Sequence, residues 1–469
     1  MELNDIKRDA YAEMQKWKAG LRNHKTSLEI AGARQVGKTY LIQKFAKENY
    51  TNVHYIDMFD KDARKKVDYA DSIMAGNKDF IRILFPDLID QPDTVAIIDE
   101  VQEYAYTYNL IKFFVNEMKS DLIVSGSFLG KTMQREYFIA CSERTTIEVK
   151  SLSFPEFLAI FELRDLYESL DLYGNSDIKD YETIKEVYTL YMLIGGYPNV
   201  VKQFLNNQSV DEMYANIKSI IDLFCNDSRR YFNDISDATI LPLLLRGVAD
   251  FLLRDKRGSL NFFNELPKLN YNIVTNTQAI QHAISWLMES RIISPCEKYT
   301  NLDSRLSVPQ YRYYFPDIGI ANYMYDLVQI NHPNKVGRLA ENFVYRCILD
   351  NKTFKHDTPC FAMFGNTEID FFDYVNGETK VYKIAVEVKS GRGAGKSVTE
   401  LLRTRKVDCL INVFGDTYGG KTENILTIPI YLFGRLNIDE IVPPMKNGAG
   451  EILKKIYPGI SPELHNDTQ

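Results

Sequence analysis

The sequence predicts an α/β protein that begins with a parallel sheet covered by helices on both faces. Over the first 160 residues, short β-rich runs alternate with longer amphipathic segments, which is typical of parallel strands joined by helices. A glycine-rich phosphate-binding motif lies between the first of these runs and the helix that follows it. From residue 154 to residue 231 the pattern is mainly helical, and strand-like runs return nearer the C-terminal end.

The individual elements follow from these patterns. The first region holds five expected strands, at 28–31, 53–58, 95–98, 122–125 and 146–149. Its longest amphipathic segments are expected helices, at 39–50 and 109–118. Beyond residue 235 we expect helices and an edge strand at 311–315, then a helix at 337–349 and strands at 367–375 and 381–388. Pro and Gly interrupt residues 443–469, which we expect to form a loosely held tail.

Length and composition set further limits. The chain has 469 residues, which predicts two to four domains at roughly 100–200 residues per domain. Its six cysteines include no CxxC pair, which excludes a ribbon-type zinc site and favours a reducing compartment. No apolar run approaches the roughly 18 residues of a membrane helix, and the first residues lack the regions of a signal peptide. We therefore expect a cytoplasmic protein with no membrane partner.

Charge is distributed unevenly along the chain. The formal charge is −7, from 56 Lys and Arg against 63 Asp and Glu, so no chain-wide basic field attracts nucleic acid. Residues 1–235 carry −8, residues 236–330 carry zero and residues 331–469 carry +1. A local strip of +4 contains one acidic residue, Glu400, and the basic residues Arg392, Lys396, Arg403, Arg405 and Lys406. Any contact with DNA is therefore expected in the C-terminal part.

Residues 32–39 fit the pattern G-x-x-x-x-G-K-[ST] and are the expected nucleotide site. They are Gly32, Ala33, Arg34, Gln35, Val36, Gly37, Lys38 and Thr39. The glycines let backbone N–H groups surround phosphate oxygens at a helix N-terminus. Lys38 is expected to reach the β- and γ-phosphates of ATP, and Thr39 to supply a hydroxyl to Mg²⁺.

Two carboxylates follow the apolar strand at 95–98. Asp99 can hold Mg²⁺ through water, and Glu100 can orient or deprotonate the attacking water, so Glu100 and Lys38 are the expected catalytic residues. This pair favours ATP hydrolysis over nucleotide storage. The next strand ends in Ser125, Gly126 and Ser127, where either serine could sense the γ-phosphate and an ordinary turn is the alternative.

Arginine fingers would imply a neighbouring subunit and hence a homo-oligomer. The candidates, for which a plain surface role is the alternative, are Arg144, Arg229 and Arg230. Residues 391–397 look like a second phosphate loop but have one residue too few between the first glycine and Gly395. We interpret that segment as a basic, flexible loop.

A second group of charged residues lies on the last two long strands. Glu368 and Asp370 share one face of a strand, and Glu387 and Lys389 share one face of the next. Asp370 and Glu387 could hold Mg²⁺ while Lys389 helps to activate water for phosphodiester hydrolysis, with Glu341 as a third acid. A solvated hairpin with alternating charges is the alternative.

The turn between these strands decides whether the two carboxylates can share an ion. A two-residue turn at Asn376 and Gly377 would place Asp370 opposite Lys383. The carboxylates of Asp370 and Glu387 would then lie roughly 13 Å apart, which is too far. A shared site requires a bulge or a longer loop centred near residues 378–379.

Residues 272–299 have the pattern of a turn, a helix and a wing strand. The expected recognition helix, 275–290, contains no Lys or Arg, although phosphate contacts supply most non-specific affinity for DNA. Asn276 and Gln278 could touch base edges. We favour a structural or protein-docking role for this helix over the reading of bases.

Together, these motifs resemble the prokaryotic AAA-type ATPases of the archaeal-ATPase and STAND-like group. The resemblance rests on motifs in the expected order, at 32–39, 98–102 (Ile-Asp-Glu-Val-Gln), 125–127, 152–157 (Leu-Ser-Phe-Pro-Glu-Phe) and 195–198 (Gly-Gly-Tyr-Pro). The C-terminal domain of unknown function found in this group is suggested by 314–319, 337–344 and 387–389.

The resemblance implies an architecture and several residue roles. It implies an additional-strand P-loop core (1–160), a helical lid (161–235), a winged helix (236–330), a PD-(D/E)xK, restriction-endonuclease-like α/β domain (331–442) and a tail (443–469). Pro198 would lie near the adenine, and Asp370, Glu387 and Lys389 would be nuclease-type residues. Two functions stay open: an Mg²⁺-dependent ATPase that controls a DNA-cutting domain, or an ATP-driven switch whose inactive nuclease-like fold docks a partner.

Overall fold

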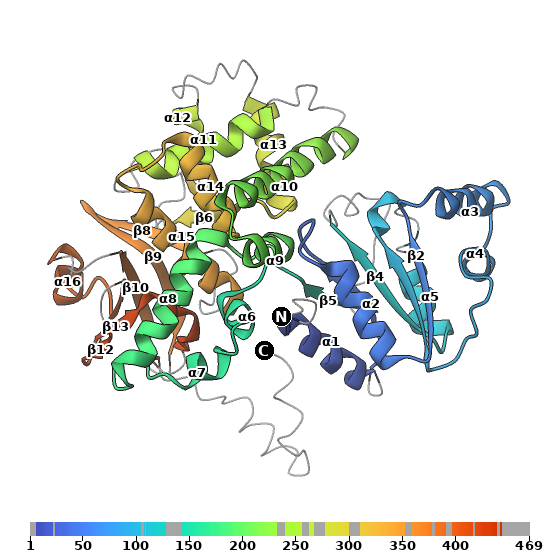
Figure 1. Cartoon of the computed structure of the whole chain (residues 1–469), viewed down its shortest axis with the longest axis horizontal. Coiled ribbons are helices and arrows are strands. Elements are labelled where there is room, and N and C mark those ends of the chain that lie inside the picture. The colour runs from blue at the N-terminus through green and yellow to red at the C-terminus, as the bar shows by residue number, and fades with distance from the viewer. Residues whose placement is uncertain are drawn as a thin grey trace, which may run out of the picture.

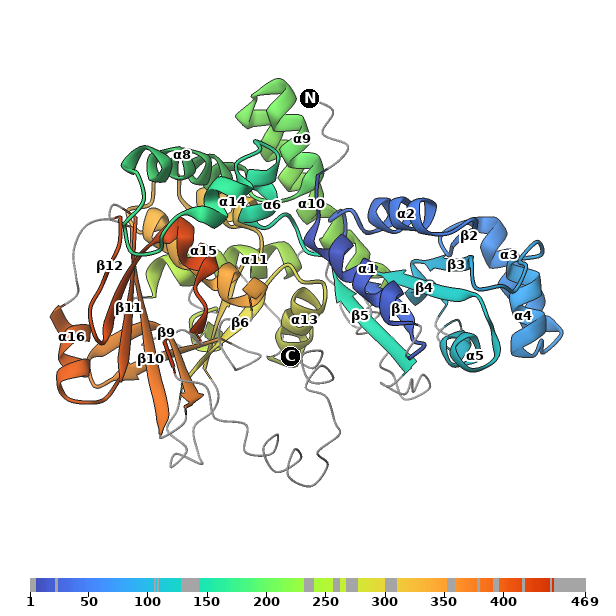
Figure 2. The same cartoon turned by 90° about the horizontal axis from the view of Figure 1, so that it is seen from below.

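Two sheets lie at opposite ends of the molecule, with a helical region between them (Figures 1 and 2). The structure is a computed structural model. It describes residues 6–21, 24–104, 107, 109–127, 143–231, 240–255, 262–266, 277–299, 310–351, 359–377, 380–390, 396–415, 418–438 and 441–442. The expected tail at 443–469 lies outside these residues.

The N-terminal sheet is parallel throughout and confirms the five expected strands to within two residues. Its strands are β1 (Ser27–Ala31), β2 (Asn52–Asp57), β3 (Thr94–Asp99), β4 (Asp121–Gly126) and β5 (Arg144–Glu148). Their order is β2-β3-β4-β1-β5, with every neighbouring pair parallel. Strand β4 therefore lies between β1 and β3, and its end adjoins both the phosphate motif and the carboxylate pair.

Helices cover both faces of this sheet because its central strands are apolar on both sides. The helices are α1 (Asp9–Gly20), α2 (Lys38–Asn49), α3 (Lys61–Ser72), α4 (Asn77–Leu84) and α5 (Asn109–Glu117), with a short 3-10 turn, η2 (Val101–Glu103). Val95 and Ile97 of β3 pack in the cluster that contains α1 and α2, whereas Ala96 and Ile98 pack with α3, α4 and α5. The alternation of side chains along the strand thus builds a three-layer α/β/α domain.

A helical region follows, as the sequence predicts. It contains α6 (Phe154–Ala159), α7 (Arg164–Ser169), α8 (Ile178–Ile194), α9 (Pro198–Asn207) and α10 (Val210–Tyr231). The break at 195–198 separates α8 from α9, and Pro198 is the first residue of α9. Further helices are α11 (Ile240–Arg254), α12 (Phe262–Glu265), α13 (Thr277–Glu289), α14 (Ile318–Val328) and α15 (Lys335–Asn351).

The second sheet is mixed and has eight strands. They are β6 (Ser294–Lys298), β7 (Tyr311–Tyr314), β8 (Cys360–Phe364), β9 (Thr367–Asn376), β10 (Val381–Lys389), β11 (Cys409–Phe414), β12 (Gly420–Lys421) and β13 (Ile425–Pro429). Their order is β12-β13-β11-β10-β9-β8-β6-β7. Because β6 pairs with both β7 and β8, one sheet contains strands from both sides of the boundary expected at residue 330.

Two details differ from the sequence analysis. Helix α16 (Lys396–Arg403) begins inside the segment interpreted as a loop, so that interpretation is wrong for residues 396–397, while 391–395 lie outside the described residues. The expected recognition helix corresponds to α13, which begins at Thr277, with 275–276 outside the described part. A 3-10 helix, η7 (Ile430–Arg435), follows the last strand.

The break at 195–198 packs against the start of α14 through glycines. A Cβ atom on Gly319 would collide with the carbonyl oxygen of Ile194, and one on Gly195 would collide with the backbone of Gly319. The helical region and the start of α14 therefore approach at backbone distance, which only residues without a side chain allow.

We expect Gly319→Ala to lower the free energy of unfolding by about 1–3 kcal/mol, because the added methyl must displace backbone. Gly337→Ala in α15 is the matched control, since no atom lies within 4 Å of a Cβ there, and it should be neutral or stabilising. Urea unfolding of the three proteins checks this expectation. Equal midpoints for the Gly319→Ala and Gly337→Ala variants would contradict it.

Candidate functional site

The phosphate motif forms the turn between β1 and α2, as expected. Helix α2 starts at Lys38, and no side chain caps its N-terminus, so its first amides are available to an anion. A Cβ atom on Gly32 would collide with the carbonyl oxygen of Val149, which follows β5. The phosphate-binding turn therefore packs directly against the backbone at Val149, just after the edge strand β5.

Lys38 is buried within the turn that it follows. Its side chain is 5% exposed, and Nζ donates to the carbonyl oxygens of Gly32 (3.1 Å) and Ala33 (2.9 Å) and to Ser127 Oγ (2.9 Å). Burial lowers the pKa of Lys38 to about 8, and the carboxylates of Glu100 and Asp99 oppose this shift. A buried ammonium ion among neutral acceptors fits an anionic phosphate ligand.

Asp99 accepts hydrogen bonds from three hydroxyl groups, which belong to helix α2 and to strands β2 and β4. Thr39 Oγ1 donates to Asp99 Oδ2 (2.7 Å), Tyr55 donates to the same oxygen (3.0 Å), and Ser125 donates to Oδ1. Carboxylate and hydroxyl oxygens are the donors that Mg²⁺ prefers, so these residues fit that ion. Burial raises the pKa of Tyr55, and the neighbouring Asp99 carboxylate adds to the shift.

Glu100 adopts a left-handed backbone conformation with φ of 53°, which is uncommon for a residue with a side chain. Its Oε2 accepts from Gln102 Nε2 (2.5 Å), and its Oε1 lies 3.5 Å from Ser127 Oγ. Ser127 thus lies between Lys38 and Glu100, whereas Ser125 contacts Asp99. The two serines that the sequence could not separate have different partners.

Three further contacts surround the phosphate loop. Arg8, which precedes α1, donates to the carbonyl oxygen of Val36 (3.0 Å) and was not predicted as a site residue. Pro198 Cγ lies 4.0 Å from the position of a Cβ on Gly37, so the break between α8 and α9 reaches the loop. Arg34 forms an ion pair with Asp227 of α10. Arg8 carries no sequence signal because it is distant from every motif.

The arginine-finger candidates differ in what the structure describes. Arg144 NH1 donates to Glu29 Oε2 (2.8 Å) on the neighbouring strand β1, and Glu29 is buried. The side chains of Arg229 and Arg230 lie outside the described part. Arg291, just after α13, contacts Glu148 at the end of β5 through Nε (2.5 Å). That contact ties the α13 region to the N-terminal sheet.

The C-terminal carboxylates have the register that a shared site requires. Strands β9 and β10 pair from Val381 opposite Asn376 to Val386 opposite Phe371, so residues 377–380 separate them. A tight turn at 376–377 is therefore excluded, and the next position along the register places Asp370 opposite Glu387.

The two carboxyl groups are buried beside one lysine. Lys389 Nζ lies 2.5 Å from Glu387 Oε1, and Asp370 Oδ2 accepts from the backbone N–H of Val388 (2.7 Å). Burial raises the pKa of Asp370 well above its usual range, with Glu341 and Glu387 adding to the shift. Burial also raises the pKa of Glu387, against the effect of Lys389.

The two flanking acids are bound to arginines. Arg338 NH1 donates to Glu341 Oε2 (2.5 Å), and Tyr314 OH donates to the same oxygen (3.3 Å). Arg312, 1% exposed, contacts Glu368. Within the described part of the chain, no group of three or more His, Cys, Asp or Glu residues is arranged to hold a metal ion. Asp370 and Glu387 are thus brought together, and Glu341, which is paired with Arg338, remains near enough to act on the pKa of Asp370.

The described portion of the basic strip is exposed. Arg403, Arg405 and Lys406 are exposed, and Arg403 pairs with Glu400 (2.5 Å). Arg392 and the side chain of Lys396 lie outside the described residues. On α13, Gln278 is exposed, and Asn276 lies outside them. Among the described helices, none has the length and apolar character needed to cross a membrane.

Two family models match separate parts of the chain. Residues 24–158 match a family described as an AAA domain, and residues 185–331 match a domain of unknown function (DUF8612). The first match covers the phosphate loop, Asp99, Glu100 and both serines. The first part of the chain is therefore an AAA-type P-loop ATPase domain, and a domain of uncharacterised function follows it.

Several solved structures are similar to this chain. The Walker-type ATPase PABY2304 of Pyrococcus abyssi is 15% identical, with 69% of this chain and 99% of that one covered and a TM-score of 0.44. The Orc1 protein of Aeropyrum pernix in complex with DNA is 12% identical, with 72% and 96% covered and a TM-score of 0.31. The RuvB Holliday junction branch migration motor of Thermotoga maritima is 14% identical, with 62% and 89% covered and a TM-score of 0.27. No curated protein matches the chain.

Because the Ser127 hydroxyl lies between Lys38 and Glu100, we expect Ser127→Ala to lower kcat for ATP hydrolysis by roughly 100-fold. Ser219→Ala, on the exposed side of α10, is the control and should hydrolyse ATP at the wild-type rate. Phosphate release under saturating ATP measures both variants. Wild-type turnover in Ser127→Ala would leave this hydroxyl without a role in the reaction.

Proposed function

We propose that this chain binds ATP with Mg²⁺, hydrolyses it, and uses its nucleotide state to control a nuclease-like C-terminal domain that acts on DNA. The ATPase part rests on one observation. Lys38 and Ser127 meet at one point of the N-terminal sheet, and Thr39 and Asp99 meet beside them. This arrangement provides a cation for phosphate, oxygens for Mg²⁺ and, in Glu100, a base for water.

Each residue of this site has a distinct task in hydrolysis. The amides at the start of α2 and the Lys38 ammonium bind the phosphate oxygens and hold the nucleotide in line for attack. Thr39 and Asp99 would hold Mg²⁺, which neutralises charge on the phosphates when bound. Glu100 orients the attacking water and takes its proton, and Ser127 positions the Glu100 carboxylate and Lys38 relative to each other. Pro198 would lie beside the adenine.

The nuclease-like part of the proposal rests on register, burial and charge. Asp370 accepts from the backbone N–H of Val388, which adjoins Glu387, and Lys389 forms an ion pair with Glu387. The network around them contains five carboxylates and three cations, namely Asp255, Glu341, Glu368, Asp370, Glu387, Arg312, Arg338 and Lys389. The formal excess of two negative charges would be balanced by one divalent cation, for which Asp370 and Glu387 would be the ligands. The exposed basic residues after α16 would approach the DNA backbone.

One observation favours a second function. The contact between Arg338 and Glu341 offsets the charge of the third acid beside the carboxylate pair, which suits a switch whose nuclease-like fold docks a partner without cleaving. In this alternative the ATPase cycle is unchanged, and the C-terminal domain supplies a surface. Cleavage assays separate the two functions.

Lys38→Ala should abolish ATP hydrolysis, because it removes the buried cation of the phosphate site. Glu100→Gln should bind ATP with near wild-type affinity and hydrolyse it roughly 100-fold or more slowly, since the amide cannot accept a proton. Binding of a fluorescent ATP analogue and release of phosphate measure the two steps separately. Retained turnover in Lys38→Ala would refute the assignment of the phosphate loop.

For the C-terminal domain, we expect plasmid and linear DNA to be cut in the presence of Mg²⁺ or Mn²⁺, and this cutting to be lost in Asp370→Ala. Asp373→Asn, at the β9 position that pairs with Ile384 of β10, is the control and should retain cutting. The assay is run with and without ATP. Absence of cutting in every condition would leave the docking function, and equal cutting by wild type and Asp370→Ala would indicate a contaminating nuclease.

A further inference from the structure

We propose that the connection between β5 and α6, residues 149–152, couples the nucleotide site to the C-terminal carboxylate site, with Arg346 of α15 as the positioning residue. This coupling rests on the proposed function, because it assumes that ATP binds the phosphate loop. It adds a route by which the nucleotide would act at a distance. The connection, hereafter the β5–α6 strap, contacts the phosphate loop, the C-terminal part and the helical region.

The strap first contacts the phosphate loop. The backbone N–H of Val149 donates to the carbonyl oxygen of Ala31 (2.7 Å), and the carbonyl of Val149 lies against Gly32. Arg8 joins the two segments a second time, because its guanidinium donates both to Val36 O (3.0 Å) and to Lys150 O (2.6 Å). A displacement of the phosphate loop therefore acts directly on the strap.

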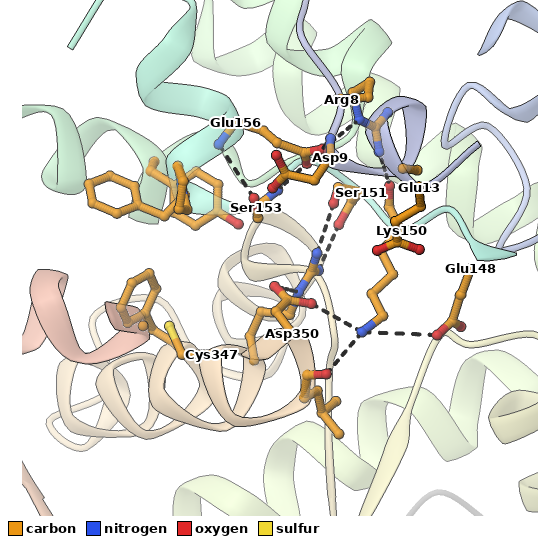
Figure 3. A pocket seen from close by; sticks show the side chains of 18 of the residues that line it. Arg8, Asp9, Glu13, Glu148, Lys150, Ser151, Ser153, Glu156, Cys347 and Asp350 are labelled. Atoms are coloured by element: carbon orange, nitrogen blue, oxygen red, sulfur yellow. Dashed lines mark hydrogen bonds and ion pairs between the residues drawn. The ribbon is translucent and has the colours of Figure 1, made fainter. Parts of the chain in front are cut away.

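The strap next contacts the C-terminal part through charged side chains, of which Figure 3 labels Lys150 and Asp350. Arg346, 3% exposed, donates to Ser151 O (2.8 Å), Ser151 Oγ (3.0 Å), Pro316 O (2.6 Å) and Asp350 Oδ2 (2.6 Å). Lys150 Nζ donates to Asp350 Oδ1 (3.1 Å) and to a carbonyl at the end of α15. Two consecutive strap residues are thus fastened to one end of α15.

The third contact joins the strap to the helical region. Leu152 N donates to Gly196 O (2.7 Å), and Tyr191 OH donates to Leu152 O (2.8 Å). Gly196 N in turn donates to Asp317 Oδ2 (2.9 Å), which caps α14. Pro198, two residues after Gly196, also lies beside Gly37 of the phosphate loop. The phosphate loop is therefore connected to the strap both directly and through the break between α8 and α9.

Helix α15 carries the coupling to the carboxylate site. Glu341 lies five residues before Arg346 on the same helix, about 7.5 Å along its axis. A helix moves as a rigid element, so a shift at Arg346 also shifts Glu341 relative to Arg338, Tyr314 and the carboxylate pair. Breaking the Arg346 contacts would leave a buried charge without partners, so the strap and the helix are expected to move together.

A cavity beside the strap gives this movement room. It has a volume of about 370 Å³, and its lining includes Arg8, Lys150, Ser151, Glu156, Arg346 and Asp350. Figure 3 shows Lys150 pointing toward Asp350 and Glu148 among the residues that line this cavity. A close-packed core would resist a shift of even one methylene group, whereas a cavity at the junction permits a second arrangement.

The test is hydrogen exchange of the full chain with and without a slowly hydrolysed ATP analogue, followed by mass spectrometry. We expect the analogue to change exchange in peptides covering 335–351 by at least threefold in wild type. Arg346→Gln should bind the analogue within threefold of wild-type affinity and lose this response, while Arg346→Lys should retain part of it. Arg164→Gln, which changes a partly exposed arginine of α7, is the matched control and should respond fully.

Each outcome bears on the coupling separately from the proposed function. Binding of a fluorescent ATP analogue is measured first, and loss of DNA cutting has no influence on the exchange readout. Unchanged exchange at 335–351 in wild type that binds the analogue, or a full response in Arg346→Gln, would overturn the coupling. If circular dichroism shows that Arg346→Gln does not fold, Lys150→Gln tests the same junction, with a reduced response expected and a full response overturning the proposal.

Discussion

A buried positive charge sets the geometry of the N-terminal site. An ammonium ion removed from water requires several acceptors, and Lys38 finds them in two carbonyls of its own loop and one hydroxyl of another strand. That hydroxyl, Ser127, can reach Lys38 only because β4 lies between β1 and β3. The same strand order brings Ser125 to Asp99. The strand order of the sheet therefore determines which side chains can meet Lys38 and Asp99 at the site.

Local pattern predicted most of the elements, because alternation and capping depend on neighbouring residues. All five strands of the first sheet and the break at Pro198 could be placed in this way. Residues recruited by distant pairing could not be found, since nothing near Tyr55 or Arg8 marks them as neighbours of the phosphate loop. The hairpin shows the limit most clearly. The sequence allowed a tight turn at 376–377 or a loop centred near 378–379, and only the observed pairing of β9 with β10 decides between them.

The net charge of −7 conceals two different electrostatic environments. In the N-terminal domain, Asp99 accepts hydrogen bonds from hydroxyl groups and Glu100 lies near Lys38. The C-terminal network instead contains more carboxylates than cationic side chains. Buried acids without matching cations are unfavourable, because burial favours the neutral form of a carboxyl group. The arginines of that network limit how many acids face the pair. Charge count alone would not reveal this arrangement.

Arginine suits the junction at residue 346 for a geometric reason. Its planar guanidinium presents donors in fixed directions, and here they meet Ser151, Pro316 and Asp350, which belong to three different segments. A lysine would hold the charge but not these directions at once. Buried polar contacts of this kind specify one arrangement rather than add much stability, since desolvation offsets most of their energy. A junction whose contacts fix the position of the strap relative to α15 can transmit a displacement from one segment to the other.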